Sequence, residues 1–303
     1  MNRKKILIFI INLTFIIFTI ESCDDNSDQI TNSPVAEYTQ IDFEPSVSND
    51  NTKMIYVHSD IDFKLSGIYL YNFATAADSL FINGSARCPD FSPDGNRIVY
   101  SMSNVLFKIK INGDSLTSLT TSGKNNFAKW NNDGSKIAYV NSDCSGSGNC
   151  GLYVMNSDGT ENTLIESDAT YPEWTDNGNN LIYFKPIKNS NGETIGDSLF
   201  SITLNKNQKN FIRTFNGDDH KYNRYLNYKS GEIIFCSTNS RGYTYIYKYN
   251  LFTNVITQLT QSQGWSPYAS EYSNKIIYTN RNQGNGRLWM MNTDGSSAVQ
   301  LTP

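Results

Sequence analysis

Histidine is scarce in this chain, since the 303 residues include only His58 and His220. The two lie in different sequence repeats, and a metal centre built on imidazole ligands needs several histidines together. A G-x-S-x-G segment, which would place a serine nucleophile on a sharp strand-to-helix turn, is also missing. We therefore predict no metal site, no cofactor and no catalytic residue that a motif identifies, and we expect the protein not to be an enzyme.

The chain also lacks a basic surface. Residues 1–22 hold three of the 25 basic and one of the 29 acidic residues, so that 22 basic residues face 28 acidic ones in the remainder and the net charge is near −6. The remaining Lys and Arg residues form no stripe, and neutralising the phosphates of a nucleic acid requires clustered basic side chains. Nucleic acid is thus excluded as a partner.

Long apolar runs are missing after residue 20. The run from Ile6 to Ile20 follows the basic residues 3–5 and is too short to span a bilayer comfortably, so we interpret residues 1–22 as a signal peptide. The run ends Glu21-Ser22-Cys23, which resembles a bacterial lipoprotein signal and implies lipidation of Cys23. Glu21 departs from the small or hydroxyl residue usual in that signal, and plain cleavage or an uncleaved anchor helix are the alternatives.

The segment 23–40 follows the signal peptide, and from Asp24 to about Val35 it has almost no apolar side chain and includes Asp25 and Asp28. Such a segment cannot bury a core, and we expect a disordered acidic tether. An acidic run after a lipidated cysteine also resembles the surface-export signals of Bacteroidetes lipoproteins. These features predict a cell-envelope location on the outer membrane, facing either the periplasm or the cell surface.

What the chain does contain is a repeat. Six times an apolar residue stands nine positions before an aromatic residue, and a second aromatic follows inside a short alternating run. A recurrence of roughly 40 to 50 residues, made of strands and turns without a helical period, is typical of a β-propeller in which each unit is one blade. We therefore predict an all-β, six-bladed propeller of four-stranded antiparallel blades. The pairs are Val47/Tyr56, Phe91/Tyr100, Trp130/Tyr139, Trp174/Tyr183, Leu226/Phe235 and Ala269/Tyr278.

Turn residues support the same division. Asp94-Gly95, Asp133-Gly134 and similar pairs stand between alternating apolar runs and favour tight hairpins. The aromatic residues of the repeat are expected to pack between blades as core. The predicted blades span residues 41–86, 87–126, 127–170, 171–220, 221–264 and 265–303.

Proline supports the ring independently of the period. In four units a proline stands two residues before the apolar residue of the pair, at Pro45, Pro89, Pro172 and Pro267. Proline is tolerated mainly on an edge strand, where its missing N–H breaks no ladder bond. We expect these prolines to mark the innermost strand of each blade, beside the central channel.

The segment Phe91–Gly95, followed by Arg97–Tyr100, resembles the repeat of the TolB-type propeller family, as do Trp130–Val140 and Gly151–Gly159. The resemblance covers about residues 41–303 and implies six blades. The α/β domain that precedes the propeller in TolB is not expected here, so the role of TolB with the peptidoglycan-associated lipoprotein is not carried over. For ring closure, either blade six supplies its own outer strand at 298–301, or residues 37–43 add an outer strand beside it.

Five cysteines fit an exported protein. Cys144 and Cys150 flank a Ser-Gly-Ser-Gly-Asn loop and are predicted to form a disulfide in an oxidising compartment. Cys88 and Cys236 fall in blades two and five, on opposite sides of the ring, and we expect them to be buried thiols.

The strand order assigns a candidate site to one face. If the strands of a blade are lettered A to D from the channel outward, the A–B and C–D turns share one face. The B–C loops and D–A connections share the other, where the long segments 59–66, 142–149, 186–197 and 281–286 lie. Binding usually resides in long loops on a rigid scaffold. We predict that eight residues near the start of the A strands ring the channel mouth on this face: Arg87, Asp90, Lys129, Glu173, Tyr222, Arg224, Trp265 and Tyr268.

An alternative assigns these residues a structural role, with Asp90, Lys129 and Glu173 in ion pairs between blades and the aromatics capping the core. Three functions are therefore open. The leading hypothesis is a monomeric, non-enzymatic, lipid-anchored scaffold that binds an envelope protein or an oligosaccharide. The second is a glycan-processing hydrolase or lyase whose carboxylates, Asp90 and Glu173, would need glycosidase spacing. The third is a structural envelope component without a small ligand.

Overall fold

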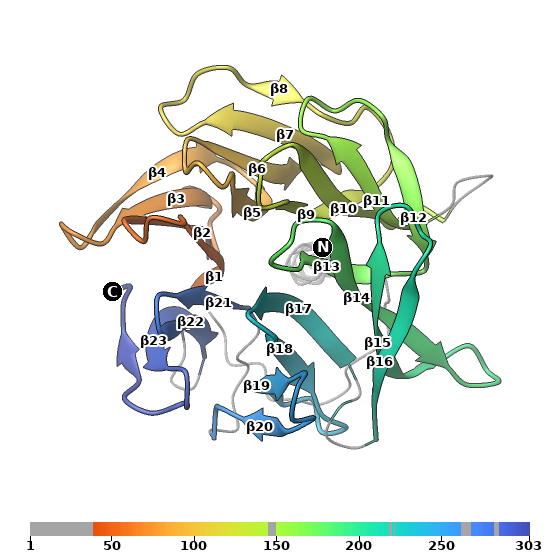
Figure 1. The fold of residues 1–303 in the computed structure, drawn as a ribbon. Coiled ribbons are helices and arrows are strands. Elements are labelled where there is room, and N and C mark those ends of the chain that lie inside the picture. The colour runs from red at the N-terminus through yellow and green to blue at the C-terminus, as the bar shows by residue number, and fades with distance from the viewer. Residues whose placement is uncertain (1–38, 145–149, 218–219, 221, 262–267, 282–284) are drawn as a thin grey trace, which may run out of the picture. The chain divides into compact units, whose positions relative to one another are not determined.

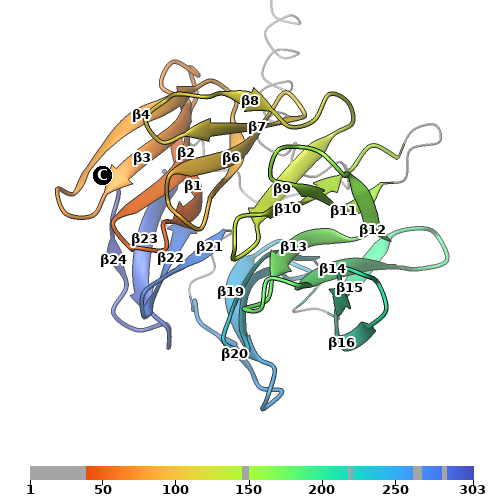
Figure 2. The same ribbon diagram turned by 45° about the horizontal axis from the view of Figure 1, so that its top comes forward.

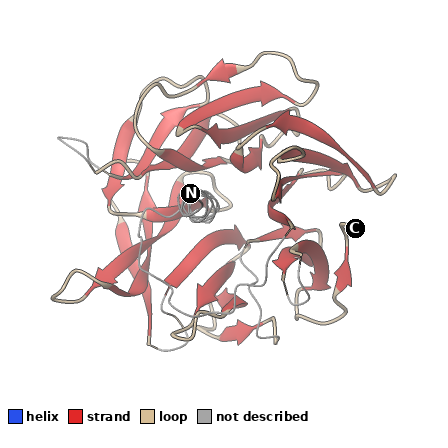
Figure 3. Cartoon of the chain, turned by 180° about the vertical axis from the view of Figure 1, so that it is seen from behind, coloured by secondary structure: helices blue, strands red, loops and turns tan. Residues whose placement is uncertain are grey.

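The computed structural model describes residues 39–144, 150–217, 220, 222–261, 268–281 and 285–303. The predicted signal peptide, Cys23, most of the tether and Trp265 lie outside the described residues. In the described part every regular element is a strand, and the strands form six four-stranded antiparallel sheets arranged as a propeller (Figures 1 and 3). The predicted all-β, six-bladed fold is confirmed.

The sheets follow one another along the chain, and in each of them consecutive strands are neighbours. Blades one to three form the first half of the ring. Their strands are β1 (Gln40–Val47), β2 (Lys53–Asp60), β3 (Gly67–Asn72) and β4 (Ala77–Asn83), then β5 (Arg87–Phe91), β6 (Arg97–Met102), β7 (Val105–Lys110) and β8 (Thr117–Ser118), then β9 (Asn125–Trp130), β10 (Lys136–Asn141), β11 (Gly151–Asn156) and β12 (Thr163–Ser167).

Blades four to six repeat the same order. Their strands are β13 (Thr170–Trp174), β14 (Asn180–Lys188), β15 (Thr194–Thr203) and β16 (Lys209–Asn216), then β17 (Tyr222–Lys229), β18 (Glu232–Thr238), β19 (Thr244–Asn250) and β20 (Ile256–Gln258), then β21 (Ala269–Tyr272), β22 (Lys275–Asn280), β23 (Arg287–Asn292) and β24 (Val299–Gln300). The segment 186–197, predicted as an irregular loop, is instead largely a continuation of the β14–β15 hairpin, because its alternating residues pair up to Lys188 and Thr194.

Burial falls from the second strand of a blade to the outermost. The middle of β6 is buried on both sides, whereas most of β4 is exposed. The repeated aromatic residue lies in the second strand and is buried in every blade, so the prediction that it is core is confirmed. In five blades it stacks on the second aromatic residue, directly opposite on the third strand, with ring centroids 5.6–5.8 Å apart. The stacked pairs are Tyr56/Tyr69, Tyr100/Phe107, Tyr139/Tyr153, Tyr183/Phe200 and Phe235/Tyr247.

The nine-residue spacing is structurally uniform only in blades one to four. The residue two positions before the repeated aromatic serves for comparison. In blades one to four it pairs with an innermost-strand residue seven positions earlier, as Ile137 does with Trp130. In blade five its counterpart Ile233 pairs with Tyr228, only five positions earlier. The A–B turn is thus two residues shorter in blades five and six. Leu226 and Ala269 are therefore not equivalent to Trp130. Pro267 lies outside the described residues.

The ring closes without an exchanged strand in the described residues, because blade six has β24 as its own outer strand. The alternative in which residues 37–43 add an outer strand is wrong for Gln40–Phe43, which belong to the innermost strand β1. At this seam the Asp42 amide donates to the Gly286 carbonyl (3.0 Å) and the Gly286 amide donates to the Gln40 carbonyl (3.1 Å). Figures 1 and 2 show β1 beside the strands of blade six.

Side chains reinforce the seam. The Thr302 hydroxyl donates to Asp42 Oδ2 (2.6 Å) and accepts the Leu288 amide (3.0 Å). A threonine in the corresponding position joins blades two and three, where Thr120 accepts from the Leu106 amide and, with the opposite hydrogen-bond direction, from Asn125 Nδ2 (3.2 Å). The first and last blades are thus joined by the contact that joins neighbours within the chain.

Candidate functional site

The innermost strands share an unusual backbone feature. In five of them, and directly before β21 in blade six, one non-glycine residue has a positive φ between 49° and 72°. In blades one, two and four this residue precedes Pro45, Pro89 or Pro172, and the pairing with the second strand shifts there, as at a β-bulge. A positive φ is costly for a side chain with a Cβ atom, and such residues occur where surrounding structure fixes them. The six residues are Glu44, Cys88, Phe127, Tyr171, Tyr225 and Tyr268.

The same six residues line a cavity of about 60 Å³ on the propeller axis. A cavity of this size has room for a few water molecules. A sugar ring or a large side chain would therefore have to remain at the mouth, and only a small group would enter.

One side of the cavity is aromatic. Ring centroids of Tyr171 lie 4.6 Å from Phe127 and 5.0 Å from Tyr225, and those of Tyr225 and Tyr268 lie 4.1 Å apart. Phe43 continues the series at 5.4 Å from Tyr268. Blades three to six and one thus contribute a connected row of rings around the axis.

The other side is polar and contains a buried ion pair. Arg87 Nη2 donates to Glu44 Oε1 (2.8 Å), and the Cys88 amide donates to Glu44 Oε2 (2.6 Å). The guanidinium also lies over the Phe43 ring at 4.6 Å and reaches the Tyr268 hydroxyl at 3.5 Å. Glu44 is thus compensated by a cation and a backbone donor, as a buried carboxylate requires.

Asp90, Lys129 and Glu173 come from three successive blades and form one ion-pair cluster. Lys129 Nζ lies 3.1 Å from Asp90 Oδ1 and 3.7 Å from Glu173 Oε2. Asp90 Oδ2 accepts from the Trp130 amide (3.0 Å) and Glu173 Oε1 from the Trp174 amide (3.0 Å). This geometry is that of the structural alternative, in which the three residues link blades.

The cluster raises the pKa of both Glu173 and Lys129, which favours the neutral form of the carboxyl and the charged form of the amine. Burial raises the pKa of Glu173 to about 7; Lys129 opposes the shift and the like charge of Asp90 adds to it. Although burial works against its charged form, the two carboxylates raise the pKa of Lys129 above its usual value. The lysine is therefore held protonated and is unsuited to act as a base.

The predicted site residues separate along the axis. Arg87, Tyr222 and Arg224 precede the bulge and lie toward the long-loop face, whereas Asp90, Lys129 and Glu173 follow it and lie toward the short turns. Tyr268 directly precedes β21 and is the positive-φ residue of blade six. Trp265 lies outside the described residues.

Two of the predicted residues meet at the long-loop mouth, whereas other members of the axial site were missed. Arg224 lies over the Tyr222 ring at 5.6 Å, at the long-loop mouth. The cavity, however, is lined by Glu44, Phe127, Tyr171 and Tyr225, which the sequence analysis did not assign to a site. A proline directly after Glu44, Cys88 and Tyr171 was the available signal, but it marks only three of the six positive-φ residues.

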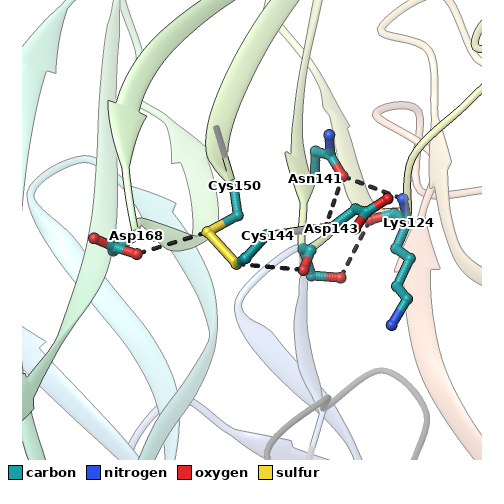
Figure 4. The surroundings of a disulfide bond; sticks show 7 residues. Lys124, Asn141, Asp143, Cys144, Cys150 and Asp168 are labelled. Atoms are coloured by element: carbon teal, nitrogen blue, oxygen red, sulfur yellow. Dashed lines mark hydrogen bonds between the residues drawn. A yellow bond between two sulfur atoms is a disulfide. The ribbon is translucent and has the colours of Figure 1, made fainter. Parts of the chain in front are cut away.

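A disulfide lies on the long-loop face, in the B–C loop of blade three. It joins Cys144 and Cys150. Figure 4 shows Asp168 next to the Cys150 sulfur (3.7 Å), and Asn141 Oδ1 accepting from the backbone amides of Lys124 and Asp143. In the described part of the chain no group of three acidic, histidine or cysteine side chains is placed to hold a metal ion.

The prediction for the other two cysteines is confirmed. Cys88 and Cys236 are buried and are not disulfide-bonded. Burial raises the pKa of the Cys236 thiol to about 12, so it is inert as a nucleophile. Among the described residues there is also no helix with the length and apolar character that crossing a bilayer requires.

These features define a six-bladed β-propeller with an aromatic axial cavity. The family model described as the TolB β-propeller domain matches residues 16–209, more than half of the chain, and the chain belongs to this family. No curated protein matches the sequence significantly.

Solved structures share the fold at low sequence identity. A putative TolB from Agrobacterium tumefaciens is 17% identical with a TM-score of 0.63, covering 76% of this chain and 86% of that one. The β-propeller domain of the Trilobed protease from Pyrococcus furiosus, described as having an open velcro topology, is 12% identical with a TM-score of 0.62 over 88% and 98%. An oligogalacturonate lyase from Vibrio parahaemolyticus is 12% identical with a TM-score of 0.57 over 82% and 77%.

Proposed function

We propose that the protein is a monomeric, lipid-anchored scaffold of the cell envelope, and that a protein or an oligosaccharide binds at the long-loop mouth of its axial channel. The observation that supports this most is the connected row of aromatic rings around the axis. These rings form a rigid base below the mouth, and because the cavity admits only a small group, a larger partner would contact Tyr222 and Arg224 at the mouth itself.

The charged residues of the axis favour binding over catalysis. Glu44 is compensated by Arg87, and the ammonium of Lys129 lies between Asp90 and Glu173. A carboxylate pair that acts on a glycosidic bond needs room for substrate or water between its members. Here a protonated lysine occupies that position.

The envelope location rests on the N-terminal sequence. Residues 1–22 have the pattern of a signal peptide, and Cys23 stands where a lipidated cysteine would. Mass spectrometry of the purified native protein tests this part directly. Acylation at residue 23 is expected, and a mature protein that begins elsewhere without lipid would contradict it.

Site-specific photocrosslinking tests the binding part. A photoreactive residue at Tyr222, at the long-loop mouth, is expected to capture a defined protein or glycan in intact cells. The matched control is the same residue at Phe252, which is 79% exposed in the C–D turn of blade five on the opposite face. Equal capture from both positions, or none from Tyr222, would argue against a site at this mouth.

A second candidate is a glycan-processing hydrolase or lyase. One observation favours it: the raised pKa of Glu173 leaves part of this carboxyl protonated near neutral pH, as a general acid needs. The fold is shared with an oligogalacturonate lyase. If wild-type protein cleaves oligogalacturonides or cell-wall glycans and Glu173→Gln loses at least about 100-fold of that rate, this candidate replaces the scaffold.

A further inference from the structure

The B–C loop of blade one, residues 60–66, exposes three large apolar side chains within five positions. The exposed fractions are 52% for Ile61, 42% for Phe63 and 53% for Leu65. Scattered surface apolar residues need no explanation, but three large exposed apolar side chains on one short loop are a candidate contact surface.

Hydrogen bonds hold this blade-one loop in shape. Leu65 donates its amide to Asp60 Oδ2 (3.2 Å), and Ser66 donates its hydroxyl to Asp60 Oδ1 (3.1 Å). The Phe63 amide donates to the Asp60 carbonyl (3.1 Å), and Tyr69 donates its hydroxyl to the Leu65 carbonyl (2.9 Å). The apolar side chains are therefore presented by a fixed backbone.

The charges at the tip compensate each other. Asp62 and Lys64 alternate with the apolar residues, and their charged groups lie 3.7 Å apart. Both remain largely exposed to solvent. The loop thus carries no net charge between Ile61 and Leu65 that would oppose contact with a low-dielectric surface.

The loop lies where the N-terminal segment joins the propeller. The Ile61 amide donates to the carbonyl of Thr39, the first described residue. The chain before Thr39 contains the apolar run Ile6–Ile20 and Cys23, the two features of the sequence that point to a membrane. An anchor at either one tethers the blade-one loop within reach of the bilayer.

We infer that the blade-one loop rests in the headgroup region of the membrane that holds the anchor. This inference rests on the anchored envelope location of the proposed function and specifies how the propeller is oriented there. Blade four lies across the ring from blade one (Figure 1). The propeller would stand on the blade-one edge, which leaves the channel mouth and the blade-four hairpin accessible to a partner.

The contribution of the loop is orientation and not retention. Three partly inserted side chains give only weak, reversible membrane binding by themselves. A tethered domain is already at a high effective concentration beside the bilayer, so a weak contact is enough to select one orientation.

Fluorescence quenching tests the contact. The full-length lipoprotein is reconstituted in phosphatidylcholine vesicles with plain or brominated acyl chains. One variant, Phe63→Trp, places a tryptophan reporter at the loop tip. Because Phe63 has a positive φ of 56°, a second variant, Leu65→Trp, places a reporter at a residue without this backbone feature. Controls are Phe252→Trp on the opposite face and Ile195→Trp on the opposite blade. After subtraction of the wild-type emission, bromine is expected to reduce the signal at 63 and 65 about twofold or more and to leave 252 and 195 unchanged.

Each outcome has a separate meaning. If the protein binds vesicles but the reporters at 63 and 65 are both unquenched, the contact of the loop with the membrane is refuted and the anchored location is not. Quenching at 195 as well as at 63 overturns the edge-on orientation. Protein that neither floats with vesicles nor carries lipid on Cys23 by mass spectrometry overturns the anchored location, and the inference with it.

Discussion

Lys129 holds two partly buried carboxylates from neighbouring blades, at 3.1 and 3.7 Å. Breaking such a cluster at its cation leaves Asp90 and Glu173 facing each other without compensation. We expect Lys129→Met to lower the free energy of unfolding by about 2–4 kcal/mol, measured by urea unfolding at pH 7.5. Lys64→Met, at an exposed pair, is the control and should change stability by less than about 0.5 kcal/mol. Equal effects of the two substitutions would contradict the interpretation.

Glu173 should make stability depend on pH. Its folded pKa is raised from 4.5 to about 7, mainly by burial, so the folded protein binds this proton more tightly than the unfolded chain. The contribution to stability is complete below pH 4.5 and is lost as the pH rises through about 7. Relative to Glu173→Gln, the wild type should lose roughly 2–3 kcal/mol between about pH 4.5 and pH 8. Urea unfolding measures the free energy of unfolding of both proteins across this range. If the two values change with pH in parallel, Glu173 has an ordinary pKa.

At the scale of strands and turns, two glycines with positive φ should respond differently to alanine. At Gly95, in the A–B turn of blade two, the nearest atom to an added Cβ is Ser48 Cβ at 3.9 Å. At Gly151, where β11 begins, an added Cβ would lie 2.2 Å from the Glu166 carbonyl oxygen of β12. Gly95→Ala should therefore cost only the backbone strain, about 1 kcal/mol.

Gly151→Ala should cost more, about 2–3 kcal/mol or above, because β11 and β12 must separate to admit the methyl group. Thermal unfolding of both variants, followed by circular dichroism, provides the comparison. Similar melting temperatures would mean that the outer strand of blade three moves aside without cost.

The order of strands was predictable because alternation and turn chemistry are local in sequence. The stacked aromatic pairs recur along the sequence because each pair lies directly opposite in one hairpin, as Tyr183 and Phe200 do in β14–β15. The shorter A–B turns of blades five and six broke that period by two residues, and Leu226 was for this reason aligned wrongly with Trp130.

The axial site was only partly predictable because its contacts are not local. Glu44 meets Arg87 across 43 positions, and nothing in the residues around Glu44 specifies that partner. The bulges likewise depend on pairing between strands, so a tyrosine such as Tyr225 gives no sequence sign of a positive φ. Arg87, Lys129 and Glu173 were found because charged residues on an inner strand are conspicuous, but their roles in ion pairs required coordinates.

For the whole molecule, the seam between blades one and six is the place to test ring integrity. Thr302, 1% exposed, bonds to Asp42 there, and Thr120 makes the corresponding bond to Asn125 between blades two and three. Thr302→Val and Thr120→Val should each cost about 1–3 kcal/mol, since each leaves buried polar partners unsatisfied.

Hydrogen exchange separates the two variants. The amides of Asp42 and Gly286 bond across the seam and should exchange faster in Thr302→Val alone. Equal protection of these amides in both variants would mean that the seam opens no more readily than an interface within the chain.

The seam has a mechanical consequence for a tethered protein. Thr39 joins the N-terminal segment to β1, and β1 is the strand that bonds to Gly286 of blade six. If the protein is anchored through its N-terminal segment, as proposed, a force along that segment would enter the propeller at this junction before reaching any other blade boundary. In an anchored protein, tension on the N-terminal segment and the opening of the ring would therefore be coupled through the single strand β1.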